Sequence, residues 1–162
     1  MTKEIPLTRG KVALVDAEDY EELSKYEWYY EKSGYACRRK THGYYDSSKV
    51  YMHREILKSI PRNKVVDHIN GNGLDNRKSN LRIITQRENT FNSGIRINNT
   101  SGYKGVSRLG NKWRARIYIE GKESHLGLFE TKEEAALAYN QAAKKHYNGI
   151  AYLNKVNTEA VK

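Results

Sequence analysis

The chain has 162 residues and a mass of 18.8 kDa, which is enough for one ordinary domain or two small ones but not for a large multi-layer catalytic fold. It holds 29 Lys and Arg against 19 Asp and Glu, a formal net charge of +10, so the expected partner is a polyanion. An anionic membrane surface would also suit this charge, but no long apolar run is present, which excludes insertion into a membrane, and we expect no membrane partner. The single cysteine, Cys37, excludes an internal disulfide and a Cys-rich zinc cluster. Nothing in the composition calls for an obligate protein partner.

The basic charge is spread over two parts of the chain. Residues 1–99 hold 18 basic and 13 acidic side chains and residues 100–162 hold 11 and 6, so each part carries +5. Between them lies a stretch rich in Asn, Ser, Gly and Thr without apolar periodicity, which is typical of a linker. We therefore predict a first module over residues 1–92, a linker over 93–100, a second module over 101–154 and a tail over 155–162.

The first module is predicted to begin with a small tyrosine-rich β-region. The pattern indicates a strand at 11–15, a helix from an Asp16 N-cap to Tyr26, strands at 27–30 and 35–39 around a tight turn, and a third strand at 49–52. A short helix at 53–57 and Pro61 follow. A β-branched run at 65–69 then enters a loop rich in Asn and Gly.

The strongest chemical signal is Asp67-His68 followed by Asn80 and Asn89. With the Asn- and Gly-rich loop between them, these residues resemble the HNH nuclease motif, in the form with Asn at the third position that is common in phage and intron-encoded homing endonucleases. The resemblance covers residues 53–92. It implies a ββα-metal core at about 62–92 that hydrolyses phosphodiester bonds and leaves 5′-phosphate and 3′-OH ends.

The residue types suit that chemistry. Hydrolysis of a phosphodiester needs a base for the attacking water and a cation to offset charge on the phosphate and the leaving oxygen. The resemblance implies that His68 is the base, that Asp67 and Asn89 hold one divalent cation, Mg²⁺ or Mn²⁺, and that Asn80 shapes the loop as part of the catalytic set. For His53, which lies upstream of the motif, three roles remain open: packing, contact with a phosphate, or catalysis. The structural alternative is that the Asp and Asn residues cap turns and His68 is a semi-buried histidine.

The second module is predicted as three antiparallel strands, at 105–108, 112–119 and 124–129, followed by one helix at 132–147. Thr131 and Glu134 form a capping box at the start of that helix. In the middle strand the apolar residues alternate with Arg114, Arg116 and Tyr118, so one face suits the helix and the other is basic and aromatic.

From Ser101 to Asn154 the chain resembles the AP2 DNA-binding domain, through Gly105-Val106, Trp113 to Ile117, Leu126 to Phe129 and the alanine-rich helix. The family lays its three-stranded sheet into the major groove of double-stranded DNA. The positions that this resemblance implies as DNA contacts are Lys104, Arg108, Arg114, Arg116 and Tyr118, all on the outer face that strand alternation selects. Arg96 in the linker is expected to follow the DNA backbone or the minor groove. His125 occupies the position at which the plant AP2 domains have tryptophan. The DNA sequence that the plant proteins recognise therefore cannot be assumed for this chain. The alternative to DNA contact is that Arg114 and Arg116 simply lie on a solvated face of the strand.

The sequence thus predicts an α+β protein with a nuclease module and a reading module. We expect a site-recognising homing endonuclease that acts on double-stranded DNA in the cytoplasm of a bacterial or phage-infected cell. One alternative is a catalytically inactive, sequence-specific DNA-binding regulator. An RNA-binding protein is a weaker alternative, because the basic face lacks paired exposed aromatic residues.

Overall fold

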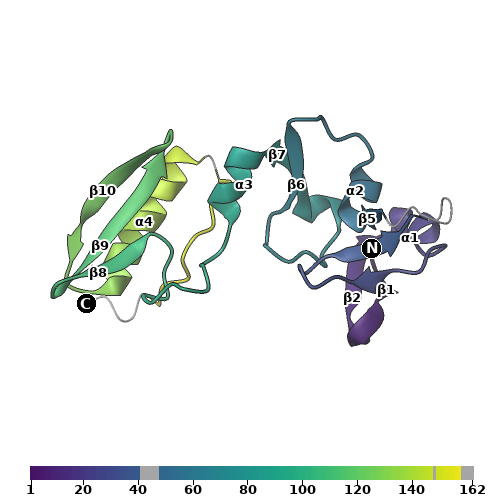
Figure 1. Ribbon diagram of the computed structural model, residues 1–162, viewed down its shortest axis with the longest axis horizontal. Helices are drawn as coiled ribbons and strands as arrows, with labels where there is room; N and C mark the ends of the chain where they lie inside the picture. The colour runs from purple at the N-terminus through teal and green to yellow at the C-terminus, as the bar shows by residue number, and fades with distance from the viewer. Residues whose placement is uncertain (41–47, 148, 158–162) are drawn as a thin grey trace. The chain divides into compact units, whose positions relative to one another are not determined.

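The computed structural model describes residues 1–40, 48–147 and 149–157, and the chain divides into two compact units, Met1–Asn89 and Thr90–Lys162 (Figure 1). The division lies within helix α3 (Gln86–Asn92), whereas the sequence placed it after residue 92. Residues 158–162 of the predicted tail lie outside the described part. Among the described residues, no helix is long and apolar enough to cross a membrane.

The first unit opens with two antiparallel strands and a helix. These are β1 (Thr2–Pro6), β2 (Val12–Asp16) and α1 (Ala17–Leu23), with a 3-10 turn, η1 (Thr8–Gly10), between the strands. The predicted helix ends at Leu23 and not at Tyr26. The expected capping role of Asp16 is also wrong, because its side chain makes no bond to the helix and instead accepts from the backbone N–H of Lys78 at 2.7 Å.

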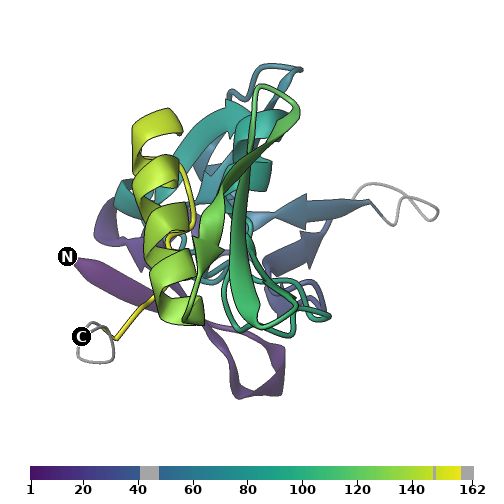
Figure 2. The ribbon, with the colours of Figure 1, turned by 90° about the vertical axis from the view of Figure 1, so that its left-hand side faces the viewer.

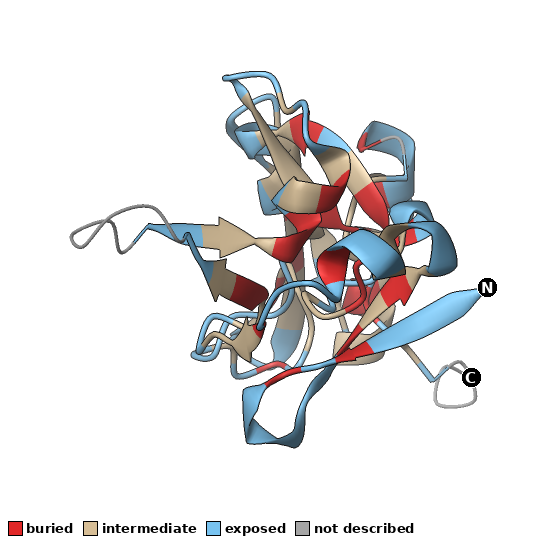
Figure 3. Ribbon diagram, turned by 90° about the vertical axis from the view of Figure 1, so that its right-hand side faces the viewer, coloured by how far each residue is buried: buried red, intermediate tan, exposed pale blue. Residues whose placement is uncertain are grey.

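A second antiparallel sheet follows in the order β3-β4-β5. Its strands are β3 (Tyr29–Tyr30), β4 (Ala36–Arg39) and β5 (Lys49–Tyr51), and the short helix α2 (Met52–Leu57) continues directly from β5. The core of the unit gathers apolar side chains from these elements, from β1, β2 and α1, and from the segment before β3, among them Ile5, Leu23, Trp28 and Met52. Figure 3 shows buried stretches on these elements, whereas the first residues of β1 are exposed.

The last part of the first unit is a hairpin followed by a helix. Strands β6 (Lys64–His68) and β7 (Leu81–Thr85) pair antiparallel, with Asp67 opposite Arg82 and His68 opposite Leu81. The loop between them carries the 3-10 turn η2 (Lys78–Asn80), and α3 begins directly after β7. The order strand, loop, strand, helix therefore places all four motif residues in one continuous segment.

The second unit is a three-stranded antiparallel sheet in the order β10-β9-β8, with one helix packed against one face (Figure 2). The elements are β8 (Val106–Leu109), β9 (Lys112–Ile119), β10 (Lys122–Phe129) and α4 (Lys132–His146). The predicted capping box is present: Thr131 and Glu134 each bind the other's backbone N–H. Small buried residues such as Ala135 and Ala143 line the helix face that meets the sheet, which permits close packing.

Gly105 shows how close that packing is. A Cβ atom at this position would lie 2.2 Å from a ring carbon of Tyr139 on α4, and the backbone has φ +76°. Only glycine meets both conditions without strain.

Candidate active site

His68 is the last residue of β6 and is only 5% exposed. Its Nε2 atom lies 3.3 Å from Oδ1 of Asn76, a fully buried residue of the loop. An amide oxygen can only accept, so this bond makes Nε2–H the donor and puts the basic lone pair of the imidazole on Nδ1. Burial lowers the pKa of His68 from its ordinary value, although Asn76 and Asp67 oppose the shift. The site therefore favours the neutral form that a general base requires.

Aromatic rings surround the imidazole of His68. The ring centroid of Tyr35 lies 5.6 Å away and that of His53 lies 5.2 Å away, edge to face. His53 is 8% exposed, and burial lowers its pKa to about 3. Its Nδ1 atom has no hydrogen-bond partner within the described part of the chain. Of the roles that the sequence left open for His53, this burial favours packing against His68 over contact with a phosphate.

Asp67 precedes His68 and is also buried, at 7% exposure. Its Oδ2 atom accepts from Nε of Arg82 at 2.7 Å and lies 2.7 Å from Nη2 of the same guanidinium. Arg82 is the cross-strand partner of Asp67 in the hairpin. Both Asp67 and His68 are paired with β7 in the regular ladder, and β6 ends at His68. The pairing of Arg82 with Asp67 was not foreseen from the sequence.

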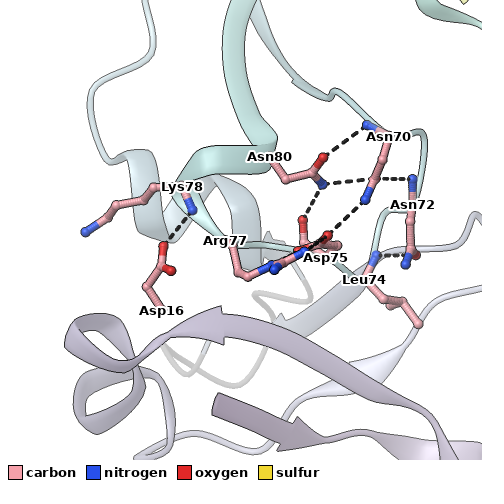
Figure 4. Close-up of polar contacts among 8 residues, drawn as sticks. All are labelled: Asp16, Asn70, Asn72, Leu74, Asp75, Arg77, Lys78 and Asn80. Atoms are coloured by element: carbon pink, nitrogen blue, oxygen red, sulfur yellow. Dashed lines mark hydrogen bonds and ion pairs between the residues drawn. The ribbon is translucent and has the colours of Figure 1, made fainter. Parts of the chain in front are cut away.

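Asn80 is the centre of the hydrogen-bond network in the loop between β6 and β7 (Figure 4). Its Oδ1 accepts from the backbone N–H of Asn70, and its Nδ2 donates both to Oδ1 of Asn70 at 3.0 Å and to the carbonyl of Asp75 at 2.8 Å. Oδ1 of Asn70 also accepts from the backbone N–H of Asn72, so the side chain of Asn80 joins both halves of the loop. An aspartate in its place would lack the two donors.

The same loop is fixed to the rest of the first unit. Arg77 makes two bonds of 2.7 Å to the carboxylate of Asp75, and this guanidinium is the main cause that lowers the pKa of Asp75. The backbone of Leu14 in β2 accepts from the N–H of Asn76 and donates to the carbonyl of Leu74, each at 2.8 Å. These contacts hold Asn76 where it meets His68.

Asn89, the fourth motif residue, lies half-buried on α3. The start of that helix is fixed by Thr85 and Glu88. The Glu88 carboxylate accepts from the backbone N–H of Thr85 at 2.7 Å, and Oγ1 of Thr85 accepts from the N–H of Glu88 at 3.1 Å. This reciprocal pair is a capping box, and Thr-x-x-Glu was a signal in the sequence that could have predicted where α3 begins. By fixing where α3 begins, this capping box also determines which side of the helix carries Asn89, the next residue.

The donor set of the motif fits a hard divalent cation. Asp67 offers carboxylate oxygen and Asn89 offers amide oxygen, and Mg²⁺ commonly takes few protein oxygens and keeps water in the rest of its shell. No group of three or more His, Cys, Asp or Glu that could hold a metal occurs in the described ranges. The residues are suited to an open site that a substrate phosphate could complete.

The second unit presents a mixed basic and aromatic face. Arg114, Arg116 and Tyr118 alternate along β9 with the buried Ala115 and Ile117, so they lie on the sheet face opposite α4. The strand pairing adds further exposed residues to this outer face: Glu123 beside Tyr118, His125 beside Arg116, and Leu128 beside Arg114. Glu123 and Leu128 are members of this face that the sequence pattern does not predict.

Two expected members of the outer face lie elsewhere. Arg108 pairs with Trp113, and its guanidinium lies 5.7 Å from the centre of that ring, so Arg108 shares the face of Trp113 and not that of Arg114. The amino group of Lys104 donates to the carbonyls of Phe91 at 2.8 Å and Ser93 at 2.6 Å, at the C-terminal end of α3. The prediction that these two residues share a face with Arg114 is therefore wrong.

Arg96, the residue predicted in the linker, is exposed. It lies close enough to Lys104 and to Tyr118 to influence the pKa of both side chains. Its positive charge therefore adds to that of the outer face.

Several known proteins are similar to parts of this chain. A family model described as HNH endonuclease matches residues 58–91. Over 55 residues, 32% of this chain and 27% of the relative, the chain is 49% identical to Dehydration-responsive element-binding protein 2D of Arabidopsis thaliana. No solved structure matches.

Two further relatives are named as HNH nucleases. An HNH homing endonuclease derived from the SPbeta prophage of Bacillus subtilis is 36% identical over 83 residues, 49% of this chain and 47% of that relative. An uncharacterized HNH endonuclease of Acanthamoeba polyphaga mimivirus is 34% identical over 155 residues, which cover 92% of this chain and 78% of the relative. With a motif, a family match and a relative that spans nearly the whole chain, the protein belongs to the HNH endonuclease family.

Proposed function

We propose that the chain is a site-recognising, homing-type DNA endonuclease that cuts phosphodiester bonds with one Mg²⁺ or Mn²⁺ ion and leaves 5′-phosphate and 3′-OH ends. The segment β6, loop, β7 and α3 would form its ββα-metal core. The observation that carries this proposal is the buried His68, which Asn76 holds in the tautomer with Nδ1 as the base and which directly follows Asp67 in β6.

In the proposed mechanism His68 accepts a proton from the attacking water at Nδ1, and the bond from Nε2–H to Asn76 stabilises the imidazolium that results. Asp67 and Asn89 would hold the divalent ion. When bound, the ion offsets negative charge on the phosphate and on the leaving 3′ oxygen. Arg82 orients the Asp67 carboxylate, and Asn80 keeps the loop, and with it Asn76, in place.

The second unit would read the DNA as an AP2-like domain. This part of the proposal is supported by the sheet of three antiparallel strands with one helix behind it, by the basic outer face of that sheet, and by the likeness to a plant protein named as an element-binding protein. The contacting residues would be Arg114, Arg116 and Tyr118, with Arg96 on the backbone. The major groove of B-DNA admits β-strands as well as helices, and in the AP2 domains that this unit resembles the sheet would lie in that groove.

The test is cleavage of supercoiled plasmid by the full chain with Mg²⁺ or Mn²⁺, against the same reaction with a chelator. We expect nicked or linear product only with the metal, and end-labelling should find 5′-phosphates. Asp67→Ala should abolish the product, whereas Asn89→Ala removes only a neutral ligand and should be partly restored by excess Mn²⁺. Metal-bound, folded protein that leaves every plasmid intact would instead support the inactive DNA-binding regulator.

A further inference from the structure

The outer face of the second unit has a carboxylate among its basic residues. Glu123 is the single acidic residue within the three strands β8, β9 and β10. Its Oε2 atom lies 2.9 Å from Nη1 of Arg116 and also accepts from the hydroxyl of Tyr118 at 2.9 Å. One oxygen thus holds two of the residues that we assign to DNA contact.

The strand geometry makes this arrangement specific. Glu123 is the direct cross-strand partner of Tyr118, and Arg116 lies two residues before Tyr118 on the same face. Side chains at directly opposed or diagonal positions of neighbouring strands are close enough to interact, even where the core does not contact them. Tyr118 is 55% exposed, and the side chains of Arg116 and Glu123 are 39% and 38% exposed, so the cluster stands at the surface.

A carboxylate at this place is unfavourable for a surface that binds only phosphate. It repels the DNA backbone and neutralises one of the charges that drive non-specific binding. Ion pairs this exposed contribute little to folding, so stability gives no reason for the pair. The hydrogen bond from Tyr118 is the main cause that lowers the pKa of Glu123, and the nearby guanidiniums of Arg116 and Arg114 add to it.

The carboxylate fits better with reading of base edges. A guanidinium has five N–H donors, and one of them accounts for the contact of Arg116 with Glu123. Fixing a long side chain before binding reduces the conformational entropy that it loses on binding. An arginine held in this way can address the O6 and N7 acceptors of guanine in the major groove, and a carboxylate can accept from the N4 amine of cytosine.

We propose that Glu123 is a specificity-determining residue of the DNA-binding surface, which positions Arg116 and Tyr118 for base recognition and opposes binding to DNA backbone alone. This inference rests on the proposed DNA-reading function of the second unit.

The test compares Glu123→Gln with Glu130→Gln in the full chain. Glu130 is a matched control, because it also forms an exposed ion pair in this unit, with Lys112 at 2.8 Å, and its substitution removes the same charge. A pool of duplexes with a randomised centre is first selected on the wild type. The affinity of each variant is then measured for the selected duplex and for a scrambled duplex of the same composition.

We expect both variants to bind the scrambled duplex more tightly than the wild type. Only Glu123→Gln should bind the selected duplex more weakly, so that its ratio of selected to scrambled affinity falls by about tenfold. Tyr118→Phe, which removes one hydroxyl without changing charge, should lower the ratio in the same direction. Thermal unfolding of each variant checks that the surface substitutions leave the fold intact.

Two results would overturn the inference, and they differ in what else they affect. If the wild type selects a sequence and Glu123→Gln keeps the same ratio, Glu123 has no part in specificity, and the proposed DNA reading stands. If the wild type selects no sequence at all, the proposed DNA-reading function fails, and this inference fails with it.

Discussion

The amino group of Lys104, in the second unit, donates a 2.8 Å hydrogen bond to the carbonyl of Phe91 in the last turn of α3. The same ammonium donates a 2.6 Å hydrogen bond to the carbonyl of Ser93. It therefore binds carbonyl oxygens that the end of a helix leaves without an intrahelical partner. Burial, with a smaller effect of Arg96, lowers the pKa of Lys104 to about 8. A lysine expected on the DNA surface instead acts as a cap for a helix.

Lys104→Met should therefore destabilise the second unit. The methionine keeps the volume of the stem but leaves the carbonyls of Phe91 and Ser93 without this donor, at a cost of about 1–3 kcal/mol in the free energy of unfolding. Urea unfolding of the full chain measures the change. Lys122→Met, at an exposed position of β10, is the control and should change the free energy of unfolding much less than Lys104→Met does. Equal unfolding curves for the two variants would refute the capping role.

Asn80→Ala should disorder the loop that carries Asn76. The substitution removes three hydrogen bonds, to Asn70 and to Asp75, from a buried residue, so we expect a loss of about 2–4 kcal/mol in unfolding free energy and of most of the cleavage rate. Asn72→Ala is the control, since its exposed side chain accepts one bond, from the N–H of Leu74. Similar losses in both variants would contradict the central place of Asn80.

The buried His53 should make stability depend on pH. Its pKa is lowered to about 3 in the folded chain, against an ordinary value near 6.5, so below pH 6.5 the unfolded chain binds a proton that the folded chain does not. The free energy of unfolding should therefore fall as pH falls from about 6.5 toward 3, by up to about 1.4 kcal/mol per pH unit from this residue.

Urea unfolding at several pH values checks this. His53→Gln should flatten the acid slope, and His146→Gln, at an exposed position of α4, should leave it unchanged. An unaltered slope in His53→Gln would mean that another group causes the acid sensitivity.

The two arginines that the strand register separates should differ in DNA binding. Arg114 lies on the outer face, and Arg108 lies on the opposite face over Trp113. Arg114→Ala should weaken binding and, if it contacts a phosphate, reduce the slope of log affinity against log salt by about one. Arg108→Ala removes the same charge and should have a much smaller effect on both quantities. Titration of a labelled duplex at several salt concentrations measures them, and a larger effect of Arg108→Ala would place the DNA on the other face.

The faces of β9 could be predicted from the sequence because strand alternation is local. Ala115 and Ile117 are buried and Arg114 and Arg116 are not, as the period of two requires. The face of Arg108 depends on which residue of β9 it pairs with, and that register is set by tertiary structure. Alternation within the short β8 segment was too brief to settle it.

Local sequence signals also explain which elements of the first unit could be predicted and which could not. Helix α2, which contains His53, and strand β6, which ends at His68, follow the apolar pattern closely. Strand β1 was missed because only Ile5 among its residues is buried, so its sequence carries almost no alternation. The contact of Asn76 with His68 and the pairing of Arg82 with Asp67 arise when separate segments come together, and spacing alone does not reveal them.

The central claim is that His68 is the base of a DNA endonuclease, and the most direct measurement is the cleavage rate of His68→Ala on supercoiled plasmid with Mn²⁺, together with its affinity for DNA. His146→Ala serves as a control with an exposed histidine. The account predicts that His68→Ala loses about 10²–10⁴-fold in rate with nearly unchanged affinity, while His146→Ala cuts as the wild type does. Cleavage by His68→Ala at the wild-type rate would contradict the account.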